Sequence, residues 1–305
     1  MTKYDVIILG SGPAGLTAAT YTSRAELKTL ILAGNEPGGQ LTTTTDVENY
    51  PGFPEGIMGP ELMTKMIEQG KRFGAELLNQ KAESIEVVSE KEFKVKSGDD
   101  EFVASSIILA TGASAKWLGL ESEQNMRGKG VSACATCDGA FFKDKKVIVV
   151  GGGDAAMEEA DYLTKFASEV TVLVRKKKEE LKASKIMQER VINNPKVNFV
   201  YNSELKEVLG DIVVTGVKII NNASKEESEL EAQGVFIAIG HKPNTDFLQG
   251  VVELEKEYVV VKDNTITSQP GIFAAGDVAD YRYRQAVTAA GLGCMAALDV
   301  EKYLA

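Results

Sequence analysis

The chain carries two glycine-rich turns, each placed between a short apolar run and a helical pattern. Residues 4–9 are apolar and β-branched and lead into Gly-Ser-Gly-Pro-Ala-Gly at 10–15, followed by an Ala-rich helical stretch. Residues 146–150 lead in the same way into Gly-Gly-Gly-Asp-Ala-Ala at 151–156. In such a turn the first glycine permits the bend, the second lets a pyrophosphate approach the backbone, and the third position allows close helix–strand packing. Two such turns predict two dinucleotide-binding units.

The helix after each turn offers free backbone N–H groups and a favourable dipole to a phosphate. The residues predicted to contact nucleotide at the first turn are Gly10, Gly12, Pro13, Ala14 and Gly15. Those predicted at the second turn are Gly151, Gly153, Asp154 and Ala156.

Between the two turns lies the segment Cys-Ala-Thr-Cys-Asp-Gly at 134–139. A Cys-x-x-Cys pair beside two nucleotide sites is typical of a disulfide that receives electrons from bound cofactors. Disulfide exchange needs a thiolate, so a proton acceptor beside the second cysteine suits this chemistry, and Asp138 is predicted to fill that role. The structural alternative for Asp138 is a helix N-cap.

A metal site is the other interpretation of the cysteines. Cys134, Cys137, Cys294 and His241 could in principle supply a Cys₃His set. Cys294 and His241 lie far apart in the sequence and form no second paired spacing, so we predict no metal site.

Strand-like runs close at Gly112 and at His241, which indicates two crossings between domains. We therefore predict a second domain, residues 114–243, inserted into a first domain made of residues 1–113 and 244–305. The fold class expected is α/β, with two Rossmann-like three-layer nucleotide-binding domains. The strand-rich runs 84–95 and 197–220 are expected to form meander sheets on the two domains.

The amino-acid composition argues against several other classes of protein. A net charge of −10 over 305 residues argues against a general nucleic-acid binder. No apolar run approaches the roughly 20 residues that span a bilayer. Three cysteines do not make a disulfide scaffold and favour a reducing compartment. These features predict a soluble cytoplasmic enzyme that contacts neither membrane nor nucleic acid.

Across its whole length the chain resembles the low-molecular-weight, bacterial-type thioredoxin reductases. The resemblance rests on six segments in order: GSGPAG at 10–15, PGGQLTTTTDVENYPG at 37–52, LATGASAKWLGL at 109–120, SACATCDG at 132–139, AIGHKPNT at 238–245 and GIFAAGDVADYRYRQAVTAAGLGCMAA at 271–297. It implies FAD in the first domain, NADPH in the second, a homodimer, and thioredoxin or a thioredoxin-like protein as partner.

The resemblance also assigns roles. Cys137 faces the flavin, and Cys134 is the thiolate that attacks the partner's disulfide. An acidic ribose partner is missing after the second strand, where Ala33 and Gly34 stand, and Glu36 follows closely. The other residues implied at the flavin are Gly39, Gln40, Asn49, Gly112, Asp277, Arg284, Gln285 and Ala286.

At the nicotinamide domain the chain departs from its family. Arg175 and Lys176 stand at the strand end that selects between NADH and NADPH, and cations there suit a 2′-phosphate. The family pattern is His-Arg-Arg followed by Arg, whereas this chain has Lys182 at the last position, and a lysine binds phosphate only as a point charge. NADPH is the predicted donor; a solvated charged helix start is the structural alternative for 175–182.

Three other functions stay open at this point. One is a reductase of the same fold fed by NADH or reduced ferredoxin, and another is a flavoprotein without catalysis. The third is a structural protein stabilised by zinc.

Overall fold

The computed structural model describes residues 3–34, 37–44 and 46–305. Two compact units divide the chain. The first unit comprises Met1–Ser114 with Lys242–Ala305, and the second comprises Ala115–His241. The expected boundaries, 1–113 with 244–305 and 114–243, differ from these by one or two residues.

The first unit contains a parallel sheet in the order β5 (Glu76–Leu78), β2 (Thr29–Leu32), β1 (Lys3–Leu9), β8 (Asp100–Leu109) and β21 (Ile272–Ala274). The strand β8 is long enough to have two neighbours on its far side. Its second half pairs with β21, whereas its first half pairs antiparallel with β7 (Glu92–Ser97), which continues to β6 (Ser84–Ser89). The expected meander over 84–95 is therefore an extension of the main sheet.

Side chains of β1 alternate between the two faces of this sheet, as the period of two in a strand requires. Val6 and Ile8 are fully buried on one face against α1 (Pro13–Arg24), α2 (Gly59–Arg72) and α7 (Ala286–Leu304). Ile7 and Leu9 are buried on the opposite face with Phe93 of β7 and the segment around Leu248. Both faces are covered, which explains why β1 is apolar throughout rather than alternating.

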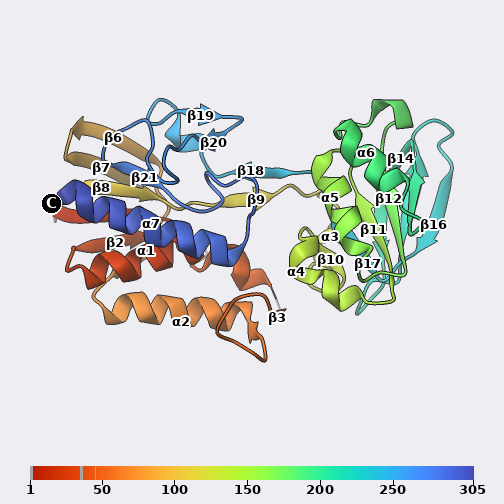
Figure 1. Cartoon of the computed structure of the whole chain (residues 1–305), viewed down its shortest axis with the longest axis horizontal. Coiled ribbons are helices and arrows are strands. Elements are labelled where there is room, and N and C mark those ends of the chain that lie inside the picture. The colour runs from red at the N-terminus through yellow and green to blue at the C-terminus, as the bar shows by residue number, and fades with distance from the viewer. Residues whose placement is uncertain (1–2, 35–36, 45) are drawn as a thin grey trace. The chain divides into compact units, whose positions relative to one another are not determined.

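Helices α1 and α7 lie side by side on their face of the sheet (Figure 1). Their close approach depends on Gly293 of α7, because a Cβ atom there would lie 2.1 Å from the carbonyl oxygen of Ala14 in α1. Gly291, on the same helix, has open space around the corresponding position.

The second unit repeats the plan with a five-stranded parallel sheet. Its order is β10 (Val131–Ser132), β17 (Gly234–Ile237), β11 (Lys146–Val150), β12 (Glu169–Leu173) and β13 (Val197–Val200). Val147 and Val149 face α5 (Asp154–Leu163), while Ile148 and Val150 face an antiparallel sheet. The second unit is thus also built in three layers.

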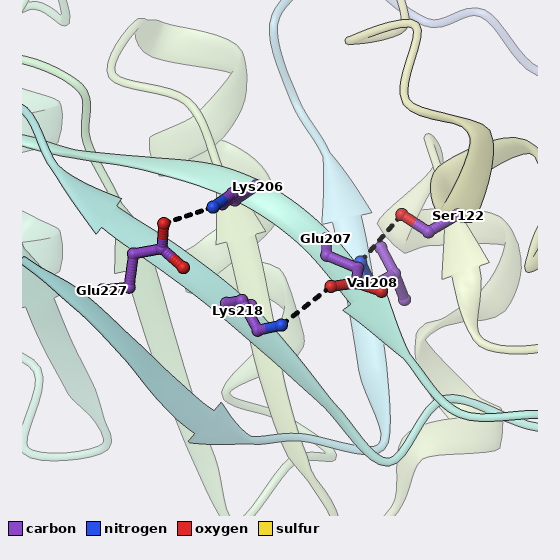
Figure 2. Close-up of polar contacts among 6 residues, drawn as sticks. All are labelled: Ser122, Lys206, Glu207, Val208, Lys218 and Glu227. Atoms are coloured by element: carbon purple, nitrogen blue, oxygen red, sulfur yellow. Dashed lines mark hydrogen bonds and ion pairs between the residues drawn. The ribbon is translucent and has the colours of Figure 1, made fainter.

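The antiparallel sheet consists of β14 (Ser203–Leu209), β15 (Gly216–Asn221) and β16 (Glu227–Glu231). Figure 2 shows ion pairs across its strands: Lys206 with Glu227, and Lys218 with Glu207 at 3.0 Å. The Ser122 hydroxyl of α3 (Glu121–Asn125) accepts a hydrogen bond from the Val208 amide at 3.0 Å. These ion pairs are exposed to solvent and contribute little, so the buried inner face carries most of the stability.

The sequence interpretation of 197–220 was wrong in one respect. We expected the whole run to form a meander, but β13 belongs to the parallel sheet and only β14 and β15 are antiparallel. A run of four apolar-rich residues looks the same in sequence whether it joins a parallel or an antiparallel sheet.

The remaining elements are short, apart from one further helix. They are β3 (Asp46–Val47), β4 (Ile57–Met58), β9 (Ala113–Ala115), α4 (Ala135–Asp138), α6 (Lys185–Ile192), β18 (His241–Pro243), β19 (Leu254–Glu255) and β20 (Tyr258–Val259), with 3₁₀ turns η1 (Gly39–Thr43), η2 (Gly139–Phe142), η3 (Lys178–Glu180) and η4 (Asp246–Leu248). Among the described residues, no helix is both long enough and apolar enough to cross a bilayer.

The contact between α1 and α7 gives a stability prediction. Gly293→Ala should lower the free energy of unfolding by about 1–3 kcal/mol, because the new methyl group overpacks the interface. Gly291→Ala is the matched control and should raise stability by about 0.5–1 kcal/mol, since alanine favours a helix. Thermal unfolding followed by circular dichroism measures both; equal effects of the two changes would contradict this account of the interface.

Candidate active site

The two cysteines at 134 and 137 are joined as a disulfide at the ends of one turn. Cys134 is the N-cap of α4, and its carbonyl oxygen accepts hydrogen bonds from the amides of Cys137 at 3.2 Å and Asp138 at 3.1 Å. Cys137 is exposed and Cys134 is half-buried. The Thr136 hydroxyl lies 3.4 Å from the Cys134 sulfur. The turn therefore holds both sulfurs at the surface of the second unit, where a reaction partner can reach them.

Asp138 lies at the end of this turn. Burial raises the pKa of its carboxyl, and a hydrogen bond with the Ser132 side chain opposes that shift. Asp138 also occupies the N-cap position of η2, but its side chain makes no capping hydrogen bond there. The capping alternative is therefore wrong, and the carboxyl belongs to the disulfide loop.

Ser132 is a residue that sequence reasoning missed. It is the last residue of β10 and is buried. Its hydroxyl accepts a hydrogen bond from the Cys134 amide at 3.0 Å and donates to the Cys134 carbonyl oxygen at 3.5 Å. Its position two residues before Cys134 is the one sequence signal that could have pointed to it.

In the first unit, the glycine turn has the geometry that nucleotide binding requires. A Cβ atom on Gly10 would lie 2.2 Å from the carbonyl oxygen of Ala110, and one on Gly15 would lie 2.0 Å from that of Gly10. Gly10 also has a φ of 110°, a region that favours glycine. Gly12, in contrast, faces open space. Gly10 and Gly15 allow the backbone segments of the turn to approach closely, whereas Gly12 leaves its backbone uncovered. Gly12 lies at the start of α1, next to Pro13 and Ala14, where a phosphate could approach.

Ser11 fastens this turn to the loop that follows β2. The Ser11 hydroxyl donates to the carbonyl oxygen of Ala33 and accepts from the amide of Gly38, both at 2.9 Å. Sequence reasoning missed this role too, because Ser11 is only the variable position of its motif. The predicted contact Glu36 lies outside the described residues.

The structure brings several of the predicted flavin contacts close to one another. A Cβ atom on Gly39 would lie 3.4 Å from the Cα of Gly12, so the loop lies against the turn. The Asn49 side chain donates to that of Gln285 at 3.5 Å, across 236 positions of sequence. The Gln40 side chain donates to the Ala113 carbonyl oxygen, next to Gly112. Segments distant in sequence thus meet within the first unit.

Asp277 follows β21 and has a strongly shifted acidity. The pKa of its carboxyl is raised to about 6, chiefly by burial and also by the nearby Asp280, while Arg284 opposes the rise. Gln285 is the N-cap of α7, and Ala286 is the first residue of that helix. A half-buried carboxyl that can accept a hydrogen bond from a ligand hydroxyl therefore lies near a cation, Arg284, in the segment that leads into α7.

In the second unit, the second glycine turn has the same construction. A Cβ atom on Gly151 would lie 2.4 Å from the Ala238 carbonyl oxygen and 2.8 Å from the Cβ of Ala156, whereas Gly153 faces open space. The Asp154 side chain accepts a hydrogen bond from the Ser184 amide at 2.8 Å, and the amide of Lys182 donates to the Gly152 carbonyl oxygen. The segment around Lys182 therefore folds back onto the turn.

Arg175 and Lys176, the cations predicted to bind a 2′-phosphate, lie just after β12. Lys176 Nζ lies 3.6 Å from Glu180 Oε1, and both side chains are about half exposed, at 47% and 51%. The Arg175 carbonyl oxygen accepts a hydrogen bond from the Asn222 side chain at 2.9 Å. An acidic residue thus competes for one of the cations that a phosphate would use.

Among residues 3–34, 37–44 and 46–305, no three His, Cys, Asp or Glu side chains are grouped so that they could hold a metal ion. Cys294 is a free thiol on α7 in the first unit, whereas Cys134 and Cys137 are paired with each other in the second.

Comparison with known proteins identifies the family. The family model for pyridine nucleotide-disulphide oxidoreductases matches residues 4–293. The thioredoxin reductase of Rickettsia felis is 53% identical, covering 98% of this chain and 97% of its own length. A bifunctional thioredoxin reductase/thioredoxin of Mycobacterium leprae is 49% identical over the full chain, which covers 66% of that longer protein. The crystal structure of thioredoxin reductase from Streptococcus pyogenes superimposes with a TM-score of 0.94 at 42% identity, covering 99% of this chain and 98% of that one.

The family uses a flavin and a pyridine nucleotide, and its thioredoxin reductases act on thioredoxin. With the full chain matched and the paired cysteines in place, this chain belongs to the pyridine nucleotide-disulphide oxidoreductases and, within them, to the bacterial-type thioredoxin reductases.

Proposed function

We propose that the flavin is FAD bound by the first unit, that the donor is NADPH bound by the second, and that electrons reach thioredoxin through Cys134 and Cys137. The observation that carries this proposal is the Cys134–Cys137 disulfide, with a half-buried carboxyl beside it, in the unit that also holds the second glycine turn.

The first unit has the features that FAD needs. The open backbone at Gly12 and the N-terminus of α1 would hold the pyrophosphate, because both present N–H groups to an anion. Asp277 would accept a hydrogen bond from the ribityl chain, with Arg284, Gln285 and Ala286 beside it. Gly39, Gln40, Asn49 and Gly112 complete the proposed set. Bound FAD would supply the ability to take two electrons from a nicotinamide and pass them to a disulfide.

The second unit has the corresponding features for NADPH. Gly151, Gly153, Asp154 and Ala156 form the proposed pyrophosphate turn, and Arg175 and Lys176 would face the 2′-phosphate. No acidic residue occupies the strand end itself, where one would favour NADH by binding the ribose hydroxyls.

The cysteines and Asp138 would divide the chemistry as follows. When two electrons break the internal S–S bond, Asp138 protonates the Cys134 sulfur. Asp138 later takes this proton back as Cys134 attacks the disulfide of thioredoxin, forming a mixed disulfide and releasing one thioredoxin thiolate. The Cys137 thiolate then attacks the Cys134 sulfur, which restores the internal disulfide and releases reduced thioredoxin. A carboxyl whose pKa is raised by burial holds a proton more readily than a surface aspartate, which suits a group that must both give and take one.

We further propose a homodimer, supported by an exposed apolar stripe on the first unit. Val287, Met295 and Leu298 follow each other along one face of α7 and are 43%, 46% and 43% exposed, and Tyr21 of α1 lies beside Cys294 of α7. Contiguous exposed apolar surface of this kind commonly marks an interface. A monomer mass in sedimentation equilibrium at micromolar concentration would rule the dimer out.

A cytoplasmic location is also proposed, because the free thiol of Cys294 and a disulfide that must cycle both suit a reducing compartment. Recovery of the enzyme from the periplasmic fraction of its native cells would contradict it.

Replacing a cysteine tests the proposed electron route. In FAD-loaded enzyme, Cys134→Ser should lower thioredoxin turnover at least about a thousandfold, because Cys137 alone cannot form the internal disulfide through which electrons would pass. Flavin absorbance and its bleaching by NADPH should persist. Cys294→Ser is the matched control and should keep full turnover. Thioredoxin reduction at the wild-type rate by Cys134→Ser would contradict the route.

Because Lys176 is paired with Glu180, we expect NADPH to bind more weakly than it would if Lys176 lacked this ion pair. Glu180→Gln should lower the KM for NADPH about two- to fivefold, the range expected for an exposed ion pair, and leave the KM for NADH unchanged. Glu179→Gln removes the same charge from the neighbouring position and is the control. Steady-state kinetics with both donors measure the effect; equal changes for the two variants, or for the two donors, would contradict the proposed phosphate contact.

A further inference from the structure

We propose that Asn222 is a positioning residue for the donor nucleotide: its side chain holds the peptide between Arg175 and Lys176, the two cations that would bind the 2′-phosphate of NADPH. This inference rests on the proposed phosphate contact of Arg175 and Lys176. It adds to that contact a residue from the antiparallel sheet, 47 positions beyond Arg175 in the sequence.

The segment after β12 is held at two consecutive carbonyl oxygens. The side-chain amide of Asn222 donates a hydrogen bond to the carbonyl oxygen of Arg175 at 2.9 Å. The backbone amide of Asn202 donates to the carbonyl oxygen of Lys176 at 3.0 Å. Asn202 lies on the turn that precedes β14, and Asn222 lies on the turn that follows β15. These two hydrogen bonds therefore restrain the backbone at the residues that carry the proposed phosphate contact.

Asn222 is itself held in place. Its backbone amide donates to the carbonyl oxygen of Asn202 at 2.6 Å. The side-chain oxygen of Asn221 closes the turn, because it accepts the amides of Ala223 at 2.9 Å and Ser224 at 3.0 Å. Asn202 has a φ of 52°, a region that asparagine enters more readily than most residues. The side chain of Asn222 thus projects from a turn whose backbone is already fixed.

The direction of the backbone matters for an arginine that binds phosphate. A guanidinium presents its N–H groups as a planar fork, which matches two phosphate oxygens only in a narrow range of orientations. The side chain of Arg175 is exposed, so its backbone sets the point and direction from which it starts. Holding the Arg175 carbonyl oxygen therefore reduces the ordering that would accompany phosphate binding, and a site that needs less ordering binds more tightly.

Removing the Asn222 side chain tests this role, because the backbone hydrogen bond to Asn202 remains. In FAD-loaded enzyme, Asn222→Ala should raise the KM for NADPH about three- to tenfold, the range expected for one hydrogen bond. The kcat at saturating NADPH and the KM for NADH should not change, since NADH has no 2′-phosphate. Calorimetric titration with 2′,5′-ADP, which carries the same phosphate and does not react, should show the same loss of affinity.

Two further variants complete the test. Asn222→Leu keeps the size of the side chain without its donor and should reproduce the effect, so it carries the test if Asn222→Ala does not fold. Asn194→Ala is the matched control, because the Asn194 side-chain amide also donates a hydrogen bond, to the Thr164 hydroxyl at 3.3 Å. Asn194 precedes β13, at the amino ends of the parallel strands, whereas Arg175 follows the carboxyl end of β12. This control should bind 2′,5′-ADP as the wild type does.

The outcomes separate the inference from the proposed function on which it rests. Unchanged binding of 2′,5′-ADP in both Asn222 variants, while Arg175→Ala binds it more weakly, would overturn the inference. An equal rise in the KM values for NADPH and NADH would also overturn it, since such a rise shows a general structural effect. If Arg175→Ala and Lys176→Ala both keep the wild-type affinity for 2′,5′-ADP, the proposed phosphate contact fails instead.

Discussion

The close contact of backbone at the two glycine turns is the constraint on which the rest of the structure depends. At Gly10 and Gly151 the chain passes so near a neighbouring carbonyl oxygen that no side chain fits. This contact fixes the end of a buried strand and the start of a helix at one edge of each sheet. Gly12 and Gly153 remain open at the same edge. The way the strands and helices are joined therefore leaves open backbone at each of the two proposed dinucleotide sites.

The disulfide loop is held by hydrogen bonds rather than by close backbone contacts at glycines. A single carbonyl oxygen, that of Cys134, accepts two amides and closes the turn that joins the sulfurs. Ser132 then links this turn to the sheet, because it is both a strand residue and a hydrogen-bond partner of the loop. The sulfurs are accessible, but the carboxyl beside them is half-buried and therefore less acidic than a surface aspartate. In the proposed mechanism, accessibility would serve the exchange with thioredoxin, and burial of the carboxyl would serve proton transfer.

Much of this architecture can be predicted from the sequence because its signals are local. The strand β11 has the bounds expected for it, 146–150, and the Ala-rich helix expected after the first turn is α1, since apolar runs and glycines mark both directly. The strand β13 was assigned to the wrong sheet, because the strand with which a four-residue run pairs cannot be inferred from that run alone. Ser11 and Ser132 were missed for a related reason. A single serine forms no sequence motif that would reveal its role, and the hydrogen-bond partners of Ser11 lie more than 20 residues away in the sequence.

The central claim is that one chain passes electrons from its flavin to the Cys134–Cys137 disulfide. The most direct test is an anaerobic count of free thiols in FAD-loaded enzyme before and after NADPH is added, with no thioredoxin present. Alkylation followed by mass spectrometry identifies which cysteines react. The account predicts that only Cys294 is alkylated beforehand and that Cys134 and Cys137 join it afterwards. A flavin that bleaches while the disulfide stays intact would contradict the account.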